Sequence, residues 1–179
     1  MLKSLALVIT LVAFAACGTV FGQNTTTPPP PTDAQIAMIA VVADTVDIDA
    51  GNMTAKKTKN KMVREFAKTM VRDHTAVNAQ ATALAKKLGV IPEESDTSKG
   101  LKSGGDKTMA QLMTLTGAAF DKAYIDNEVS YHEAVLGVLD KTLIPNTRNA
   151  ELKSLLESAR PIFVTHLEHA KKLQASLTK

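Results

Sequence analysis

The sequence predicts an all-α protein built as a bundle of four helices. Its 179 residues include no Trp, two Tyr and five Phe, so the core must consist mainly of aliphatic side chains, as in packed helices rather than β-sandwiches. Apolar residues also recur at intervals of three and four residues along four long segments, which is the helical period. With 45% hydrophobic residues, a chain of this length is expected to form one domain around one core.

The first 22 residues predict a signal peptide. Lys3 supplies its positive charge, and the apolar run "LALVITLVAFAA" that begins at Leu5 is too short to span a bilayer stably. Two cleavage sites stay open. "FAAC" resembles a lipoprotein leader that ends before Cys17, whereas "VFG" before Gln23 suits ordinary signal peptidase. The protein is therefore expected to be extracytoplasmic: lipid-anchored through Cys17 in the outer membrane, periplasmic, or secreted.

A disordered Thr/Pro linker is expected at residues 23–32, which read "QNTTTPPPPT". The four prolines favour extended polyproline II geometry, and the segment has nothing to bury. It is either a tether to an anchor or a disordered mature N-terminus. The helical domain is then expected over residues 33–177, and it holds no disulfide because Cys17 is the only cysteine.

The first two helices have recognisable ends. The cap "TDAQ", with Thr32 or Asp33 accepting the first free N–H groups, starts a helix that runs to about Lys57. The second helix is expected from about Asn60 to Leu88, and Gly89 ends it. Its predicted apolar stripe is Met62, Phe66, Met70, Val77, Ala81, Leu84 and Leu88.

The second half of the chain begins with a polar segment rich in Ser and Gly. Residues 93–105, "EESDTSKGLKSGG", predict a long connection that crosses the bundle. The third helix is expected in two pieces, residues 106–115 and 117–143, with Pro145 ending the second. The fourth helix is expected from about Thr147 to Leu177, with Pro161 on the face away from the core.

Each predicted helix carries an ionisable side chain on its apolar face. At about 100° per residue, four such residues fall within about 40° of the centre of their stripes: Asp47, Asp73, Glu128 and His166. Three further histidines fall about 65 to 85° from those centres and can lean inward: His74, His132 and His169. In contrast, Asp49, Glu133 and Glu168 point away from the stripes.

Buried carboxylates need compensation, because an unpaired one costs several kcal/mol. A divalent metal such as iron, manganese or zinc, bound by these seven candidate ligands, would supply it. The alternative is a metal-free network in which His132, His166 and the Tyr124 and Tyr131 hydroxyls satisfy Asp73 and Glu128. No hydrolase motif occurs in the sequence. Its 21 Lys and Arg against 18 Asp and Glu are too balanced for nucleic-acid binding.

Three motifs carry a resemblance to a known family: "EFAKTMVRDHT" from Glu65, "GAAFDKAYIDNEVSYHEAVL" from Gly117 and "HLEHAKKL" from His166. They resemble the exported bacterial family named domain of unknown function 4142, over about residues 33–177. The resemblance implies a ferritin-like four-helix bundle, often labelled an outer-membrane protein, and no defined activity. The recurrent polar positions of that family fall on Asp73, His74, Asp121, Tyr124, His132, His166 and His169.

The sequence departs from the di-iron ferritins in one respect. Those proteins need Glu-x-x-His on two helices, and this chain has no such spacing, since Glu128 and His132 are four residues apart. A mononuclear site, or a bundle that has lost its site, fits the spacing better. Two functions are therefore expected: an exported envelope protein that binds a divalent metal in its core, or a non-enzymatic envelope protein that binds a partner and has a structural polar core.

Overall fold

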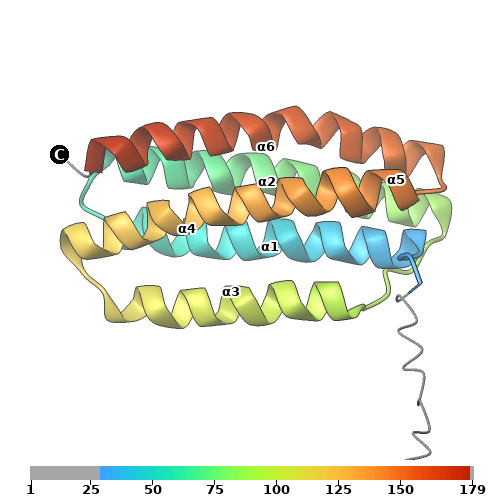
Figure 1. The fold of residues 1–179 in the computed structure, drawn as a ribbon, viewed down its shortest axis with the longest axis horizontal. Helices are drawn as coiled ribbons and strands as arrows, with labels where there is room; N and C mark the ends of the chain where they lie inside the picture. The colour runs from blue at the N-terminus through green and yellow to red at the C-terminus, as the bar shows by residue number, and fades with distance from the viewer. Residues whose placement is uncertain (1–28, 178–179) are drawn as a thin grey trace, which may run out of the picture.

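The computed structural model describes residues 29–177, and this part of the chain is helical without any strand. Figure 1 shows five long helices lying alongside one another, with successive helices running in opposite directions. These are α1 (Asp33–Lys57), α2 (Lys61–Leu88), α3 (Asp96–Thr114), α4 (Gly117–Val138) and α6 (Ala150–Leu177). The all-α prediction is confirmed, whereas the predicted signal peptide, Cys17 and most of the linker lie outside the described residues.

The ends of α1 and α2 agree with the prediction. The Thr32 side chain accepts a hydrogen bond from the Gln35 N–H, and the Gln35 side chain accepts one from the Thr32 N–H in return. This capping box satisfies donors that the first turn leaves free. Asn60 caps α2 in a similar way. At its other end Gly89 has a φ of 64°, the left-handed conformation that glycine adopts without strain.

The predicted long connection at residues 93–105 is wrong, because most of it belongs to helix α3. Ser95 caps this helix through hydrogen bonds with the Ser98 backbone and side chain. Its Gly105 lies directly against α1, where an added Cβ would come within 2.8 Å of Val46 Cγ1. Glycine here permits a close helix contact instead of breaking the helix, so the true connection from α2 to α3 is only residues 89–95.

The chain after α4 remains helical for longer than predicted. α4 leads into a π-helical turn, η1 (Leu139–Leu143), and then into the short α5 (Ile144–Asn146). Pro145 does not end the helix before itself: it directly follows the π-helical turn, and the helical run continues to Asn146. Helix α6 begins at Ala150, three residues after the predicted start, and contains the exposed Pro161, as expected.

The core consists of two apolar clusters with a polar layer between them. One cluster contains Phe66, Met70 and Ala170, and the other contains Val77 and Phe163. On α2, the segment between Met70 and Val77 therefore links the two clusters, and on α6 the segment between Phe163 and Ala170 does so. The buried ionisable residues described below come from these linking segments and from the matching parts of α1 and α4.

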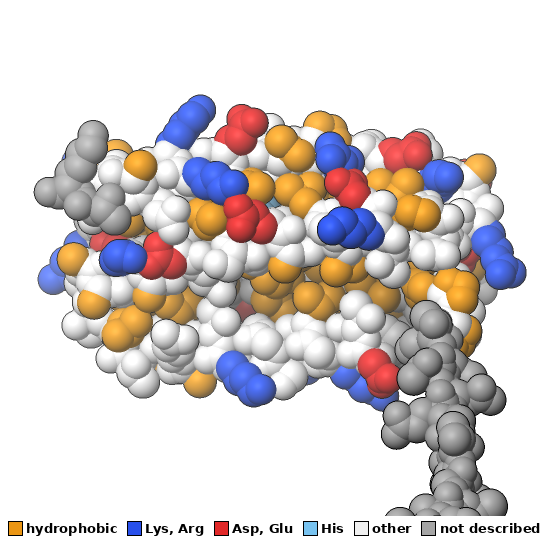
Figure 2. All heavy atoms as spheres, in the orientation of Figure 1, with side chains coloured by type: hydrophobic (Ala, Val, Ile, Leu, Met, Phe, Trp, Pro, Cys, Tyr) orange, Lys and Arg blue, Asp and Glu red, His pale blue; other side chains and the backbone are white. Residues whose placement is uncertain are grey.

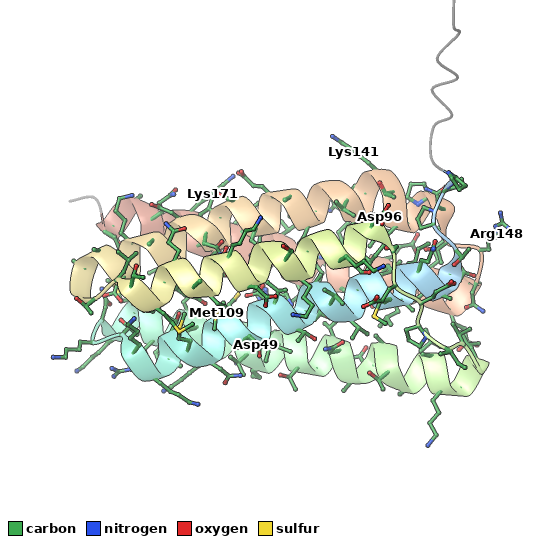
Figure 3. All side chains as sticks on the ribbon, turned by 90° about the horizontal axis from the view of Figure 1, so that it is seen from below. Asp49, Asp96, Met109, Lys141, Arg148 and Lys171 are labelled. Carbon is green, nitrogen blue, oxygen red and sulfur yellow. The ribbon has the colours of Figure 1, made fainter. Side chains whose placement is uncertain are left out.

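The outer faces of the bundle carry most of the charge. Figure 3 shows Lys141, Arg148 and Lys171 projecting away from the helices. Asp49, Glu133 and Glu168 are exposed, as the sequence predicted. In residues 29–177, no helix combines the length and the apolar character needed to cross a membrane.

Candidate metal centre

Six ionisable side chains meet in the middle of the bundle, each exposed by 3% or less. They are Asp44 and Asp47 of α1, His74 of α2, Glu128 and His132 of α4, and His166 of α6. Burying three carboxyl groups together is costly unless cations or protons compensate them. The arrangement of the three imidazoles shows how this site can do so.

His74 lies on the buried face of α2, between two carboxyl groups of α1. Its Nδ1 is 2.7 Å from Asp44 Oδ1, which is a hydrogen bond. Its Nε2 is 3.0 Å from Asp47 Oδ2, close enough for an ion pair but poorly aligned for a hydrogen bond. Phe163 stacks on the imidazole, with ring centroids 5.0 Å apart and an interplanar angle of 12°. The ring is therefore fixed from three sides.

The other two imidazoles are also anchored through one nitrogen. His132 Nδ1 lies 3.0 Å from the backbone oxygen of Glu128, one turn earlier on α4. His166 Nε2 lies 3.0 Å from Asp73 Oδ2 on α2. Each contact has the geometry for the ring N–H to donate to an oxygen, and each leaves the second ring nitrogen for another partner.

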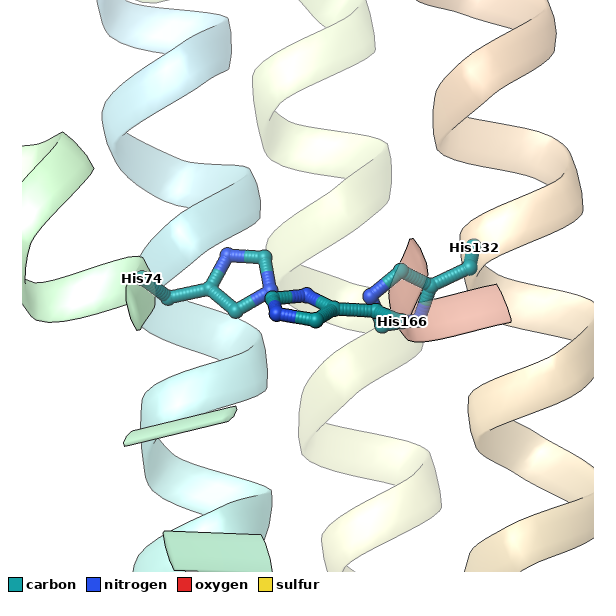
Figure 4. Close-up of side chains that lie close together, drawn as sticks. All are labelled: His74, His132 and His166. Carbon is teal, nitrogen blue, oxygen red and sulfur yellow. The ribbon is translucent and has the colours of Figure 1, made fainter. Parts of the chain in front are cut away.

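The second nitrogens of the three rings point into a common space. Among the described residues, His74 Nε2, His132 Nε2 and His166 Nδ1 have no hydrogen-bond partner; we call them the inward nitrogens. Within residues 29–177, both Asp47 carboxylate oxygens and Glu128 Oε2 also lack such a partner. Figure 4 shows the three rings close together, and their centroids are 5.2 to 5.6 Å apart.

The distances suit a metal ion. The three histidines each offer a nitrogen, and these atoms all lie within 4.8 Å of one another. Asp47, Glu128 and His132 form a second group with the same limit. Because the two groups share His132, and because His74 Nε2 and His132 Nε2 both approach Asp47 Oδ2 at 3.0 and 3.5 Å, the two groups surround one place.

The surroundings of two groups, His74 and Glu128, favour their protonated forms in the metal-free protein. Burial opposes a charge on His74, but the neighbouring carboxylates of Asp47 and Asp44 outweigh it and raise the pKa of His74 to about 10. Burial and the nearby charge of Asp47 raise the pKa of Glu128 well above its usual range. Asp47 stays ionised, because His74 and His132 overcome the effect of burial and lower its pKa. In the metal-free site, a charged His74 therefore offsets the neighbouring carboxylates, and the raised pKa of Glu128 favours its neutral form.

The other two imidazoles of the cluster, those of His132 and His166, are neutral at physiological pH. Burial lowers the pKa of His132, and it lowers the pKa of His166 to about 4 despite the hydrogen bond to Asp73. Neutral imidazole is the form that binds metals.

The structure brings together five of the seven predicted ligands: Asp47, His74, Glu128, His132 and His166. Asp73 lies at the edge, where its carboxylate bonds to Arg72 at 2.7 Å as well as to His166. The predicted order on α2, with Asp73 inside and His74 at the flank, is wrong. His169 does not reach the cluster: it is exposed and packs edge-on against Phe66, with ring centroids 5.1 Å apart.

Sequence reasoning missed Asp44. It lies three residues before Asp47, a spacing that puts two side chains on one helix face, so it could have been found. Two of the polar positions taken from the family resemblance, Asp121 and Tyr124, are not among the candidate ligands. Asp121 accepts a hydrogen bond from the Thr58 hydroxyl, away from the cluster. The buried Tyr124 hydroxyl interacts with the Glu128 carboxyl at the edge of the cluster, whereas the Tyr131 hydroxyl donates to the backbone oxygen of Ala43.

A helical bundle with a buried cluster of imidazoles and carboxyl groups defines this molecule as an all-α protein with a candidate metal centre. The chain belongs to the family described as Domain of unknown function (DUF4142), whose family model matches residues 19–173. This confirms the resemblance seen in the sequence motifs. Neither a curated protein nor a solved structure matches the chain.

Proposed function

We propose that this protein binds one divalent transition-metal ion through the inward nitrogens of His74, His132 and His166, with Asp47 and Glu128 as carboxylate ligands. One observation carries the proposal: every imidazole of the cluster is anchored through one nitrogen and presents the other to the same space.

This pattern is the usual arrangement around metal-binding histidines. A ligating histidine generally donates its second N–H to a carboxylate or a backbone carbonyl, which fixes the tautomer and the orientation of the ring. Here Asp44 and Asp73 supply the carboxylates, and the Glu128 backbone supplies the carbonyl. A finished metal-free network would instead use both nitrogens, because buried polar atoms are nearly always hydrogen-bonded.

The donor set favours iron, manganese or zinc, since imidazole and carboxylate together suit these ions. We propose a ferritin-like bundle with one ion, because the two candidate ligand groups share His132. The chain also lacks the Glu-x-x-His spacing of di-iron sites.

The alternative is a structural polar network in an envelope protein that binds a partner. The raised pKa of His74 favours it, because a protonated His74 between Asp44 and Asp47 compensates both carboxylates without metal. The two functions differ in metal content, so a direct measurement separates them.

Elemental analysis of protein purified without chelators is the test, and about one ion per chain is expected. Zinc, manganese or iron added at 100 times its Kd would raise the free energy of unfolding by about 2.7 kcal/mol. That corresponds to a rise in Tm of roughly 5 to 10 °C.

His166→Gln should lose the ion, whereas the matched variant His169→Gln should keep it. Metal-free protein that none of the three ions stabilises would leave the structural network as the function.

We propose further that residues 1–22 direct export and that residues 33–177 form the exported domain. The sequence "FAAC" supports lipidation of Cys17 and attachment to the outer membrane, with the Thr/Pro linker as a tether. Mass spectrometry of the mature protein should find a lipidated Cys17 as its first residue. A mature chain that starts with an unmodified Gln23 would contradict the anchor and favour a periplasmic or secreted protein.

A further inference from the structure

A pocket of about 440 Å³ lies between α1, α3 and α4. Figure 2 shows this face of the bundle, where hydrophobic side chains gather in a hollow between α3 and α4. The pocket borders the candidate metal centre without reaching it. Asp47 and Glu128 belong to its wall, but each residue is only 1% exposed, and both Asp47 carboxylate oxygens and Glu128 Oε2 are buried. A side chain must therefore separate the pocket from the polar atoms of the site.

Tyr131 of α4 lies between the pocket and the site. In the described part of the chain it is the one aromatic residue that lines the pocket. Its ring also packs edge-on against the ring of His132, with centroids 6.2 Å apart. Burial and the nearby charges of Asp47 and Glu128 raise the pKa of Tyr131, so its hydroxyl is close to both carboxyl groups. One face of Tyr131 is thus turned to the pocket and the other to the buried cluster.

A hydrogen bond holds Tyr131 across the seam between α1 and α4. Its hydroxyl donates to the backbone oxygen of Ala43 on α1, at a distance of 2.8 Å. Such a bond contributes only about 1 kcal/mol net, because water replaces it when the hydroxyl becomes exposed. Breaking the contact between Tyr131 and Ala43 therefore costs little, provided that the ring has somewhere to go.

The pocket gives the ring this space. Exposed residues such as Gly104 and Ser130 line its outer part, so it is open to solvent. Gly100 and Gly104 leave the α3 wall without side chains, and an added Cβ at either position would meet no atom of the described residues within 4 Å, beyond its own helix. Side chains in a close-packed core have no such room to change rotamer. Tyr131 has it on the pocket side alone.

We propose that Tyr131 is a gate of the buried site. It closes the site while its hydroxyl is bonded to Ala43, and it opens the site to solvent when its ring turns into the pocket. A movement is required in any case, because an ion cannot otherwise reach ligands that have no accessible surface. The gate is a property of the metal-free chain, whereas its role in the passage of the ion rests on the proposed function.

Labelling of the histidines with diethyl pyrocarbonate in the metal-free mature protein tests the gate. The reagent acylates neutral imidazoles, and mass spectrometry of peptides gives the rate for each histidine. His169 is exposed and serves as the internal reference, while the buried His132 should react far more slowly. Tyr131→Ala removes the wall and should speed the labelling of His132, relative to His169, by about tenfold or more. Tyr131→Phe keeps the ring but loses the bond to Ala43, so it should speed this labelling by about two- to tenfold.

Leu101→Ala is the matched control, because Leu101 is a half-buried residue of the same pocket on the α3 side. It enlarges the pocket away from the site, so His132 should be labelled as in wild type. Circular dichroism establishes that each variant is helical. Unchanged labelling of His132 in helical Tyr131→Ala, or an equal acceleration in Leu101→Ala, would overturn the proposal. If Tyr131→Ala does not fold, Tyr131→Phe decides, and unchanged labelling there would overturn it as well.

The rates of cobalt(II) uptake and release, followed by visible absorption, separate the gate from the metal site. A gate alters both rates by the same factor and leaves the Kd unchanged, whereas a ligand alters the Kd. Tyr131→Ala should therefore accelerate uptake, and loss to a chelator, by about tenfold, with a Kd within about threefold of wild type. A weaker Kd with an unchanged uptake rate would overturn the gate. If the chain binds no metal while Tyr131→Ala exposes His132 to the label, the metal proposal fails and the gate stands.

Discussion

His74 Nδ1 lies 2.7 Å from Asp44 Oδ1, and both side chains are buried. This contact determines which nitrogen of His74 faces the centre of the bundle. With Nδ1–H donated to Asp44, Nε2 is the nitrogen that gives up its proton when a metal binds and then offers its lone pair to the ion. Asp44 is therefore a positioning residue that acts through His74, and the first prediction concerns its removal.

Asp44→Ala should weaken metal binding about 10- to 100-fold, the usual effect of removing a partner of a ligating histidine. Competition with a chromophoric chelator measures the Kd. Asp49→Ala is the matched control, because Asp49 is an exposed aspartate on the same helix. Equal affinities of the two variants would mean that Asp44 does not orient a ligand.

Glu128→Gln separates metal binding from a structural network. Glu128 already holds a proton in the metal-free protein, since burial raises its pKa, and Gln has nearly the same shape. The variant should therefore be as stable as wild type, or more stable, without metal. With metal it should lose the rise in Tm, because a carboxylate ligand is gone, and Glu133→Gln on the exposed face should keep it. A Tm unaffected by metal in both Glu128→Gln and wild type would favour the structural network.

Metal binding should release protons near neutral pH. His74, with its pKa raised to about 10, is protonated in the metal-free protein, and the raised pKa of Glu128 favours a proton there as well. A bound metal requires a neutral imidazole and an ionised carboxylate. Binding therefore expels these protons, and affinity should increase as pH rises from 6.5 toward 10. Calorimetric titration with zinc in two buffers of different ionisation enthalpy counts the protons; identical heats in both buffers would contradict the prediction.

Most of the fold could be predicted from the sequence because its signals are local. The Thr32 and Asn60 caps and Gly89 mark helix ends through hydrogen bonds and dihedral preferences within a few residues. Helix α3 could not be predicted in this way. Its glycines read as a loop, and only contact with Val46 of α1 explains why Gly105 is favourable inside a helix. That contact depends on the tertiary structure.

The site was predicted in composition but not in geometry, and helix α2 shows the reason. Its predicted stripe included Met62, which is 52% exposed, and omitted Val63 and Ala67, which are fully buried. This error rotated the assumed core face toward Asp73 and away from His74. His169 shows a second limit: a flank position can lean inward or outward, and the sequence does not reveal that His169 packs against Phe66 outside the cluster.

Gly51→Ala should destabilise the bundle at a close contact between α1 and α2. An added Cβ would lie 2.8 Å from Val71 Cγ2 and 3.0 Å from the backbone oxygen of Ala67, and the backbone oxygen cannot move away without shifting a helix. Overpacking of this kind typically costs about 1 to 3 kcal/mol, which exceeds the gain of about 1 kcal/mol from helix propensity. A fall of a few degrees in Tm is expected by differential scanning calorimetry.

Gly137→Ala is the control. In residues 29–177 no atom beyond its own helix lies within 4 Å of the added Cβ. Only the gain in helix propensity remains, so Tm should rise slightly. A Gly51→Ala protein as stable as Gly137→Ala would show that the two helices can separate at this contact without cost.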